Sequence, residues 1–184
     1  MRLFIGIRIP EDIKENIHGI TQKLSKKIKE ARLVPPENLH ITLKFLGEVE
    51  DNRLEAIKDN LVSICRQVVP FDIFFKGTGV FPEGKQIRVF WIGVSSGGIL
   101  KNLNIKIEKE LETLGFPRDN RFQEHLTVAR FKSIPNRSFI SELMESYKES
   151  FFGSMYAEHV EIIQSILTSG SPVYETLLKI PFVR

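Results

Sequence analysis

The chain has 184 residues, of which 42% are hydrophobic and 27% charged, a balance typical of a folded globular protein and not of a disordered segment. The net charge of +3 is compatible with a phosphate or nucleic-acid ligand but is too small to require one. No uncharged stretch approaches the roughly 20 residues of a bilayer-spanning helix, so we expect no such helix.

The first half of the chain alternates β-rich runs with segments of helical periodicity. Runs rich in Ile, Val, Phe and Tyr predict strands at 2–8, 39–46 and 71–80. Between them, apolar residues at helical spacing predict two helices, one carrying Ile13, Ile17, Ile20, Leu24 and Ile28 and the other Leu54, Ile57, Leu61, Cys65 and Val68. Cys65 is the only cysteine, which excludes a disulfide framework, and its apolar neighbours predict a core thiol. The N-terminal strand leads into a charged helix without a secretory leader, so we expect a cytoplasmic protein.

The second half repeats this order and adds one strand. Strands are predicted at 87–94, 125–131, 159–168 and 173–180. Two further helices are predicted from Leu100, Leu103, Ile107, Leu111 and Leu114, and from Phe139, Ile140, Leu143 and Tyr147. The hairpin loops "GTGVFPEGKQ" and "TSGSPV" carry the Gly, Pro and Ser that tight turns require.

The two halves resemble each other in sequence. "RLFIGI" from Arg2 matches "RVFWIGV" from Arg88, and "HITLKF" from His40 matches "HLTVAR" from His125, which indicates an internal duplication. We therefore predict a bilobal α+β fold in which two pseudo-symmetric β-α-β-α-β lobes, with mainly antiparallel sheets, flank a central cleft. Residues 1–184 are expected to form one domain with lobes at about 1–85 and 86–184, and an exchange of terminal strands between the lobes is left open.

Each half contributes a strand that carries His-x-Thr. Strict alternation over residues 39–45 places Leu39, Ile41, Leu43 and Phe45 toward the core and His40, Thr42 and Lys44 on the opposite face. His125 and Thr127 share a face of the second strand in the same way. Because equivalent strands should face each other across the pseudo-two-fold axis, we expect both His-x-Thr pairs to line one cleft.

Two facing histidines suggest proton transfer on both sides of a reacting centre, one acting as general base and the other as general acid. Threonine hydroxyls beside them could hydrogen-bond the oxygens of a phosphate. Two readings compete with this one: both histidines could be structural, or they could bind zinc together with Glu124 or Glu48, although a catalytic zinc normally takes three protein ligands. His18 and His159 are not repeated, and we expect them to be a helix-surface residue and a strand-start residue without function.

The paired motifs "HITL" and "HLTV" resemble those of the 2H phosphoesterase superfamily, and within it the RNA 2',3'-cyclic phosphodiesterases, also called 2'-5' RNA ligases. The resemblance extends over nearly the whole chain, including "FLGEV", "GTGVFP", "ARFK" and "SPVYE". It implies hydrolysis of RNA 2',3'-cyclic phosphate to a 2'-phosphomonoester without metal or other cofactor, with reverse 2'-5' ligation at the same site.

The resemblance also implies residue roles. His40 would be the proton donor and His125 the proton acceptor, while Thr42 and Thr127 would bind the phosphate. Arg130 matches an arginine that could neutralise the phosphate, but strict alternation sends it to the face opposite His125. Phe45, Phe81, Trp91 and Phe131 are candidates for stacking on bases, although a core role is the commoner one for each.

The expected partner is RNA with a 2',3'-cyclic phosphate end, such as a tRNA fragment, and we expect a monomer with no obligate protein partner and no membrane. Two alternatives remain from the sequence. One is a phosphodiesterase of small cyclic nucleotides or 2'-5' oligonucleotides, and the other is a non-catalytic RNA-binding module.

Overall fold

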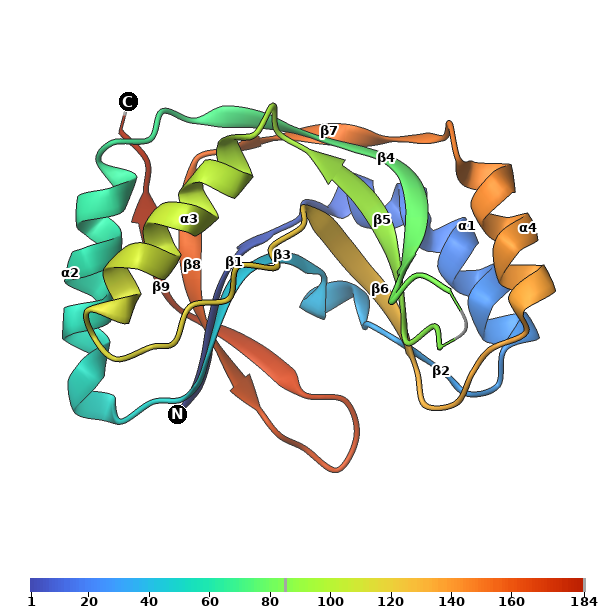
Figure 1. The fold of residues 1–184 in the computed structure, drawn as a ribbon, viewed down its shortest axis with the longest axis horizontal. Helices are drawn as coiled ribbons and strands as arrows, with labels where there is room; N and C mark the ends of the chain where they lie inside the picture. Colours follow the sequence, from blue (N-terminus) through green and yellow to red (C-terminus); the bar gives the residue numbers. More distant parts are fainter. Residues whose placement is uncertain (85, 184) are drawn as a thin grey trace.

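The computed structural model describes residues 1–84 and 86–183, which form two antiparallel sheets, each covered by helices (Figure 1). The helices are α1 (Glu11–Lys27), α2 (Leu54–Cys65), α3 (Ile99–Glu112) and α4 (Arg137–Tyr147), with short 3₁₀ turns η1 (Pro36–Asn38) and η2 (Asp51–Arg53). The strands are β1 (Arg2–Arg8), β2 (Ala31–Leu33), β3 (His40–Glu48), β4 (Phe71–Phe81), β5 (Val89–Ser95), β6 (His125–Phe131), β7 (Phe151–Ala157), β8 (His159–Ile166) and β9 (Val173–Pro181).

The two sheets have the strand orders β3-β1-β8-β9 and β2-β6-β5-β4-β7, and every pair of neighbours is antiparallel. We call them the first and the second sheet. β1 and β3 in the first sheet correspond to β5 and β6 in the second, so the repeated sequences form equivalent strand pairs. The predicted α+β fold with two antiparallel sheets is confirmed.

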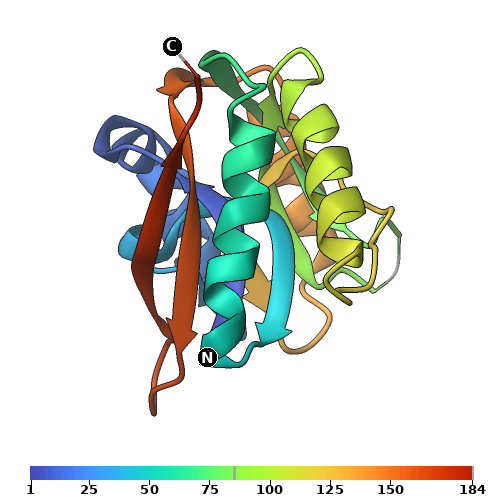
Figure 2. The same cartoon turned by 90° about the vertical axis from the view of Figure 1, so that its left-hand side faces the viewer.

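Helices α2 and α3 pack on the first sheet, and α1 and α4 pack on the second (Figures 1 and 2). In α1 the periodic residues Ile13, Ile17, Ile20 and Leu24 are buried, as the sequence predicts. Acidic residues in its first turn and lysines in its last turn also suit the helix dipole. Within the described part of the chain, no helix is both long and apolar enough to cross a membrane.

The lobes do not follow the boundary expected near residue 85. β4, from the first half of the chain, lies beside β5 in the second sheet, and β8, from the second half, lies beside β1 in the first sheet. The helices cross over as well, because α1 covers the second sheet and α3 contacts β3 in the first. Each half of the sequence therefore contributes strands and a helix to both lobes, and the ranges 1–85 and 86–184 describe the repeat and not the lobes.

Two strands were missing from the sequence-based prediction. β2 has only three residues, too few to show alternation, and it pairs with β6 at one edge of the second sheet. β7 forms the other edge beside β4 and contains Gly153 at a positive φ of 122°, which weakens its strand signal. Both strands extend the sheet without altering the arrangement of the His-x-Thr strands.

Candidate active site

The two His-x-Thr strands, β3 and β6, contact each other where the two sheets meet. Two adjoining cavities lie along this contact, of about 680 Å³ and about 430 Å³. Thr42, Thr127 and Arg130 line both of them, while His125 lines the larger and His40 the smaller. All five residues singled out by the sequence therefore lie around two adjoining cavities, which together are called the cleft below.

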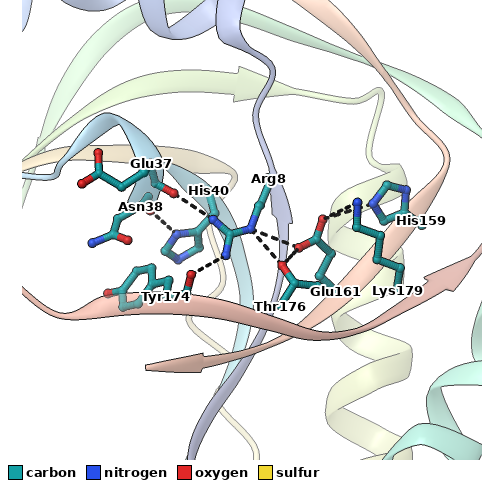
Figure 3. A network of polar contacts seen from close by, with 9 residues as sticks. All are labelled: Arg8, Glu37, Asn38, His40, His159, Glu161, Tyr174, Thr176 and Lys179. Carbon is teal, nitrogen blue, oxygen red and sulfur yellow. Dashed lines mark hydrogen bonds and ion pairs between the residues drawn. The ribbon is translucent and has the colours of Figure 1, made fainter. Parts of the chain in front are cut away.

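The imidazole of His40 is held at both nitrogens. Nδ1 donates to the carbonyl oxygen of Asn38 at 2.6 Å, and Nε2 lies 2.9 Å from the hydroxyl of Thr42 (Figure 3 shows the first contact). Because Nδ1 carries the proton, neutral Nε2 is the acceptor and the threonine hydroxyl donates to it. The ring packs at 4.5 Å from the Phe4 ring centroid and edge-on to Tyr174 at 5.3 Å.

The backbone around this ring is closely packed. Gly6, on β1, lies beside the ring of His40. A Cβ atom on Gly6 would come within 2.8 Å of the carbonyl oxygen of Ile41 and within 3.3 Å of the His40 ring. A side chain at this position would displace the ring or the strand, so glycine is required for the present orientation of His40.

Burial lowers the pKa of His40 from 6.5 to about 4, since desolvation disfavours the charged imidazolium. The hydrogen bond to the Asn38 carbonyl and the charge of Glu161 oppose this effect, whereas the charges of Arg8 and Arg130 add to it. In the ligand-free protein at neutral pH, His40 is therefore uncharged with the lone pair of Nε2 directed at Thr42.

His125 repeats part of this geometry. Its Nδ1 donates to the carbonyl oxygen of Gln123 at 2.7 Å, as that of His40 does to the residue two places before it. Burial is again the main cause of a lowered pKa, with Arg130 adding to it and the Gln123 carbonyl opposing it. Both rings thus have the same tautomer, which leaves the lone pair of each neutral ring on Nε2.

A β-bulge in β3 corrects the predicted orientation of two residues. Ile5 pairs with Lys44 but Gly6 pairs with Thr42, so Leu43 is the extra residue. Beyond the bulge the alternation reverses: Lys44 is buried at 5% exposure, and Phe45 is 65% exposed and lines both cavities. The expectation that Phe45 faces the core is therefore wrong, and Lys44, expected on the face of His40 and Thr42, is instead buried beneath the larger cavity.

The same bulge occurs in β6 and brings Arg130 into the cleft. Phe90 pairs with Ala129 and Trp91 with Thr127, which leaves Val128 as the extra residue. Val128 and Ala129 are both buried, so Arg130 turns to the face of His125 and Thr127. The face assigned to Arg130 by strict alternation is corrected for a physical reason, the inserted residue.

The other stacking candidates differ in accessibility. Phe81 packs edge-on to His125 at 4.9 Å and lies 5.3 Å from Trp91. Trp91 lies flat over Gly79 on the neighbouring strand, where a Cβ would come within 2.1 Å of the indole. Phe131 is only 4% exposed and belongs to the core. Phe81 and Trp91 therefore form the wall behind His125, and of the four stacking candidates Phe45 is the one that lines the cavities.

The remaining polar candidates lie elsewhere. The Glu124 carboxylate bonds to the backbone and hydroxyl of Ser96 and to the Lys101 backbone near the start of α3. Glu48 is an exposed residue at the end of β3. Among the described residues, no three His, Cys, Asp or Glu side chains form a group suited to a metal. The zinc hypothesis therefore gains no third ligand from either glutamate.

The two other histidines and the cysteine are now placed. His18 is exposed on α1, as predicted, and its ring contacts Gln22. His159 begins β8 and contacts Glu161 at 3.2 Å. Cys65 is fully buried, and burial raises the pKa of its thiol to about 12, so the prediction of a core thiol is confirmed.

Sequence reasoning missed the residues that surround His40 from behind. Arg8 pairs with His40 across the β1–β3 ladder, and buried Glu161 binds Arg8 from β8 (Figure 3). A signal was present, because each is a lone charge within an apolar strand, "FIGIRI" and "HVEII". Charges at such positions are seldom buried without a partner, and here they are partners of each other.

The crystal structure of TT0787 from Thermus thermophilus superposes on this chain with a TM-score of 0.84 and 27% sequence identity. The superposition covers 99% of this chain and 98% of that chain. The crystal structure of Escherichia coli LigT complexed with 3'-AMP has the same fold, with a TM-score of 0.76, 22% identity, and coverage of 100% and 98%.

Residues 7–91 match the family described as LigT like Phosphoesterase. The RNA 2',3'-cyclic phosphodiesterase of Methanocaldococcus jannaschii is 38% identical over 96% of this chain and 98% of its own length. That of Archaeoglobus fulgidus is 39% identical over the same shares of the two chains. The chain belongs to the LigT-like phosphoesterase family.

Proposed function

We propose that the protein is an RNA 2',3'-cyclic phosphodiesterase that opens the terminal cyclic phosphate to a 2'-phosphomonoester. The observation that carries the proposal is that His40 and His125, one from each sheet, line two adjoining cavities that share Thr42 and Thr127. It is further supported by the family and by two relatives of that name at 38% and 39% identity over nearly the full chain.

In the proposed reaction, His125 Nε2 takes a proton from water as the water oxygen attacks phosphorus. The bond between phosphorus and the 3'-oxygen breaks, and His40 gives a proton to that oxygen. The products are a free 3'-hydroxyl and a 2'-phosphate, and the two histidines have exchanged protonation states. General acid and general base catalysis of this kind contribute about 10² to 10⁴-fold each.

Thr42, Thr127 and Arg130 are proposed to hold the non-bridging oxygens of the phosphate. The two hydroxyls and the guanidinium border both cavities, so a phosphate between the histidines would be within reach of all three groups. Charge developing on the phosphate in the transition state would be stabilised by a preorganised cation and two donors.

The acid role of His40 requires the substrate. In the free protein its pKa of about 4 leaves it neutral at pH 7. The negative charge of a bound cyclic phosphate would raise this pKa, because an anion next to an imidazole favours the protonated form. The arrangement therefore couples protonation of the acid to binding of the phosphate.

The test is product analysis on a short RNA that ends in a 2',3'-cyclic phosphate, in EDTA, for wild type and for His40→Ala and His125→Ala. We expect wild type to yield the 2'-phosphate and each variant to lose about 10² to 10⁴-fold in kcat. Unchanged activity in the double variant would rule out two-histidine catalysis. Loss of wild-type activity in EDTA alone would favour a metal-dependent reaction.

The same assay separates the alternatives. Faster turnover of small cyclic nucleotides or 2'-5' oligonucleotides than of cyclic-phosphate-ended RNA would indicate a small-molecule phosphodiesterase. RNA binding without turnover by wild type would indicate a binding module. Reverse 2'-5' ligation, tRNA fragments as the natural RNA, a monomeric state and a cytoplasmic location stay predictions.

A further inference from the structure

A charged network that the proposed reaction does not use lies behind His40 (Figure 3). At its centre the Nε atom of Arg8 lies 3.2 Å from the Glu161 carboxylate, whose side chain is only 2% exposed. Glu161 also accepts from the hydroxyl of Thr176 at 2.5 Å and lies 3.2 Å from His159 and 3.9 Å from Lys179. Although burial opposes ionisation, these contacts lower the pKa of Glu161 to about 2, so it is an anion at neutral pH.

The guanidinium of Arg8 connects its own strand, β1, to β8, β9 and η1. Besides Glu161 on β8, it donates from Nε to Thr176 on β9 at 3.1 Å. Its Nη1 donates to the carbonyl oxygen of Glu37 in η1 at 2.8 Å, and its Nη2 to that of Tyr174 on β9 at 2.9 Å. This use of several donors in fixed directions is specific to arginine, because a lysine ammonium is a single point charge.

Both backbone segments that Arg8 anchors touch the His40 ring. Glu37 precedes Asn38, whose carbonyl accepts the Nδ1 proton of His40 at 2.6 Å. Tyr174 packs its ring edge-on against the imidazole, at 5.3 Å and an interplanar angle of 72°. Asn38 is additionally bound through its side chain to the carbonyl of Pro172 at 2.6 Å, which joins η1 to the β8–β9 hairpin.

We propose that Arg8, held by Glu161 and Thr176, is a positioning residue that fixes the tautomer and orientation of His40 through the backbone of η1 and β9. The proposal rests on the proposed function only for its effect on turnover. Arg8 acts through the Asn38 carbonyl and the Tyr174 ring and has no part in proton transfer. Glu161 has the separate task of neutralising a cation that would otherwise disfavour protonation of His40.

The charge part of the proposal follows from the groups that face His40. Arg8 from β1 and Arg130 from β6 both lower its pKa, and Glu161 from β8 raises it. Removing the Glu161 charge while keeping its shape would leave two cations facing the ring. His40 would then be harder to protonate, which is the wrong direction for the acid of the reaction.

Among the residues that the structure describes, no such network lies behind His125, which therefore serves as an internal reference. In the β5–β6 ladder it is paired with Gly93, where His40 is paired with Arg8. Its orienting carbonyl belongs to Gln123, next to Glu124 and the start of α3. A substitution that acts through Arg8 should thus alter His40 and leave His125 unchanged.

The test is ¹⁵N NMR of the histidine rings, combined with steady-state kinetics, in Arg8→Lys and Glu161→Gln. In Arg8→Lys we expect His40 to change from the pure Nδ1–H form to a mixture of tautomers. We expect kcat to fall about 10- to 100-fold with little change in KM, because the ring is no longer held in the productive orientation. In Glu161→Gln we expect the pKa of His40 to fall further. His125 should keep its tautomer in both variants.

One control variant and one substitute for Arg8→Lys complete the test. His159→Gln removes a contact of Glu161 but none of Arg8, and should leave the His40 tautomer and kcat unchanged. If Arg8→Lys does not fold, Thr176→Val is the milder substitute. It should change the His40 tautomer and kcat in the same direction as expected for Arg8→Lys.

The inference is overturned if His40 keeps its tautomer in Arg8→Lys, whatever happens to kcat. It is also overturned if the tautomers of His40 and His125 change together, since that would show a general loss of structure. A change of the His40 tautomer alone, in a protein that proves inactive on cyclic-phosphate-ended RNA, would support the positioning role and reject the proposed function instead.

Discussion

His40 and His125 occupy equivalent positions in the two sheets, yet their surroundings differ. His40 lies between two aromatic rings with a buried, charged network behind it, whereas His125 lies against Phe81 with Trp91 beyond. Each ring donates Nδ1 to a backbone carbonyl two residues earlier. The two halves thus share the hydrogen bond that orients each ring, whereas the environments that set the pKa values of the rings differ.

The two bulges show the same divergence. Each turns one residue inward and the next into the cleft: Lys44 and Phe45 in β3, and Ala129 and Arg130 in β6. One side of the cleft therefore presents an aromatic ring and the other a guanidinium. A nucleotide with a terminal phosphate is itself asymmetric, and such a cleft can orient it because one end prefers stacking and the other a cation.

The largest expected effect is that of replacing Lys44, the residue that the bulge in β3 turns inward. Lys44 is buried against Glu108 and also donates to the carbonyl of Pro117 at 2.8 Å. We expect Lys44→Ala, which gives β3 the residue found in β6, to lower the free energy of unfolding by about 3–5 kcal/mol, because it leaves the Glu108 carboxylate buried and unpaired. Urea unfolding measures the loss. The double variant Lys44→Met with Glu108→Leu should recover most of it, and a loss below about 1 kcal/mol in Lys44→Ala would contradict the prediction.

The cleft position of β6 is tested by Arg130→Ala. We expect kcat/KM on cyclic-phosphate-ended RNA to fall about 10² to 10³-fold, because the cation that stabilises the phosphate in the transition state is removed. Arg130→Lys should retain part of the activity through its charge but lose the planar fork. Arg137→Ala, at the start of α4 on the outer face of the second sheet, is the control and should be unaffected. Equal effects at the two positions would place Arg130 outside the site.

The corresponding position of β3 is tested by Phe45→Ala. If the exposed ring stacks on a base, KM should rise by the equivalent of about 1–3 kcal/mol, with kcat nearly unchanged. Phe45→Tyr preserves the aromatic face and should behave as wild type. A fall in kcat without a change in KM would argue against stacking and for a role in the chemical step.

The smallest effect concerns pH. The proposed reaction needs one histidine protonated and one neutral, a form whose population peaks between their two pKa values. Burial lowers both pKa values, that of His40 to about 4, so we expect kcat/KM to be maximal below pH 6.5. Bound phosphate raises both values, so the maximum of kcat should lie at higher pH. If kcat/KM and kcat both reach their maximum at the same pH, at or above pH 7, the expected difference between the two profiles is contradicted.

The position of the four His-x-Thr residues beside the cavities could be predicted because alternation and duplication are local patterns, whereas their catalytic roles stay predictions. Sequence reasoning misplaced Lys44, Phe45 and Arg130 because a bulge is one extra residue in the pairing of two strands, and no pattern within one strand reveals it. An apolar ring such as Phe45 is also compatible with a core position, so composition gave no correction. The face of the sheet on which each side chain lies is set by the pairing register between neighbouring strands, and this register depends on residues far apart in the sequence.

The sequence left an exchange of terminal strands between the lobes open without specifying it, and it did not predict the network behind His40. Both depend on which segments are neighbours in space: β8 lies beside β1, and this contact brings Glu161 to Arg8. The lone charges in two apolar strands indicated that each needed a partner, but did not identify it. Helix faces and core residues such as Cys65 were predictable because their burial follows from helical periodicity alone.

The crossing of β4 and β8 between the sheets has a consequence for dividing the protein. A cut in the connection between β4 and β5 would leave each fragment with one His-x-Thr strand and with elements of both sheets. Neither fragment could complete a sheet or cover its apolar face, so each should remain unfolded when alone. Mixed together, the fragments should reassemble around each other, and catalytic activity would then report their association, as in a split enzyme.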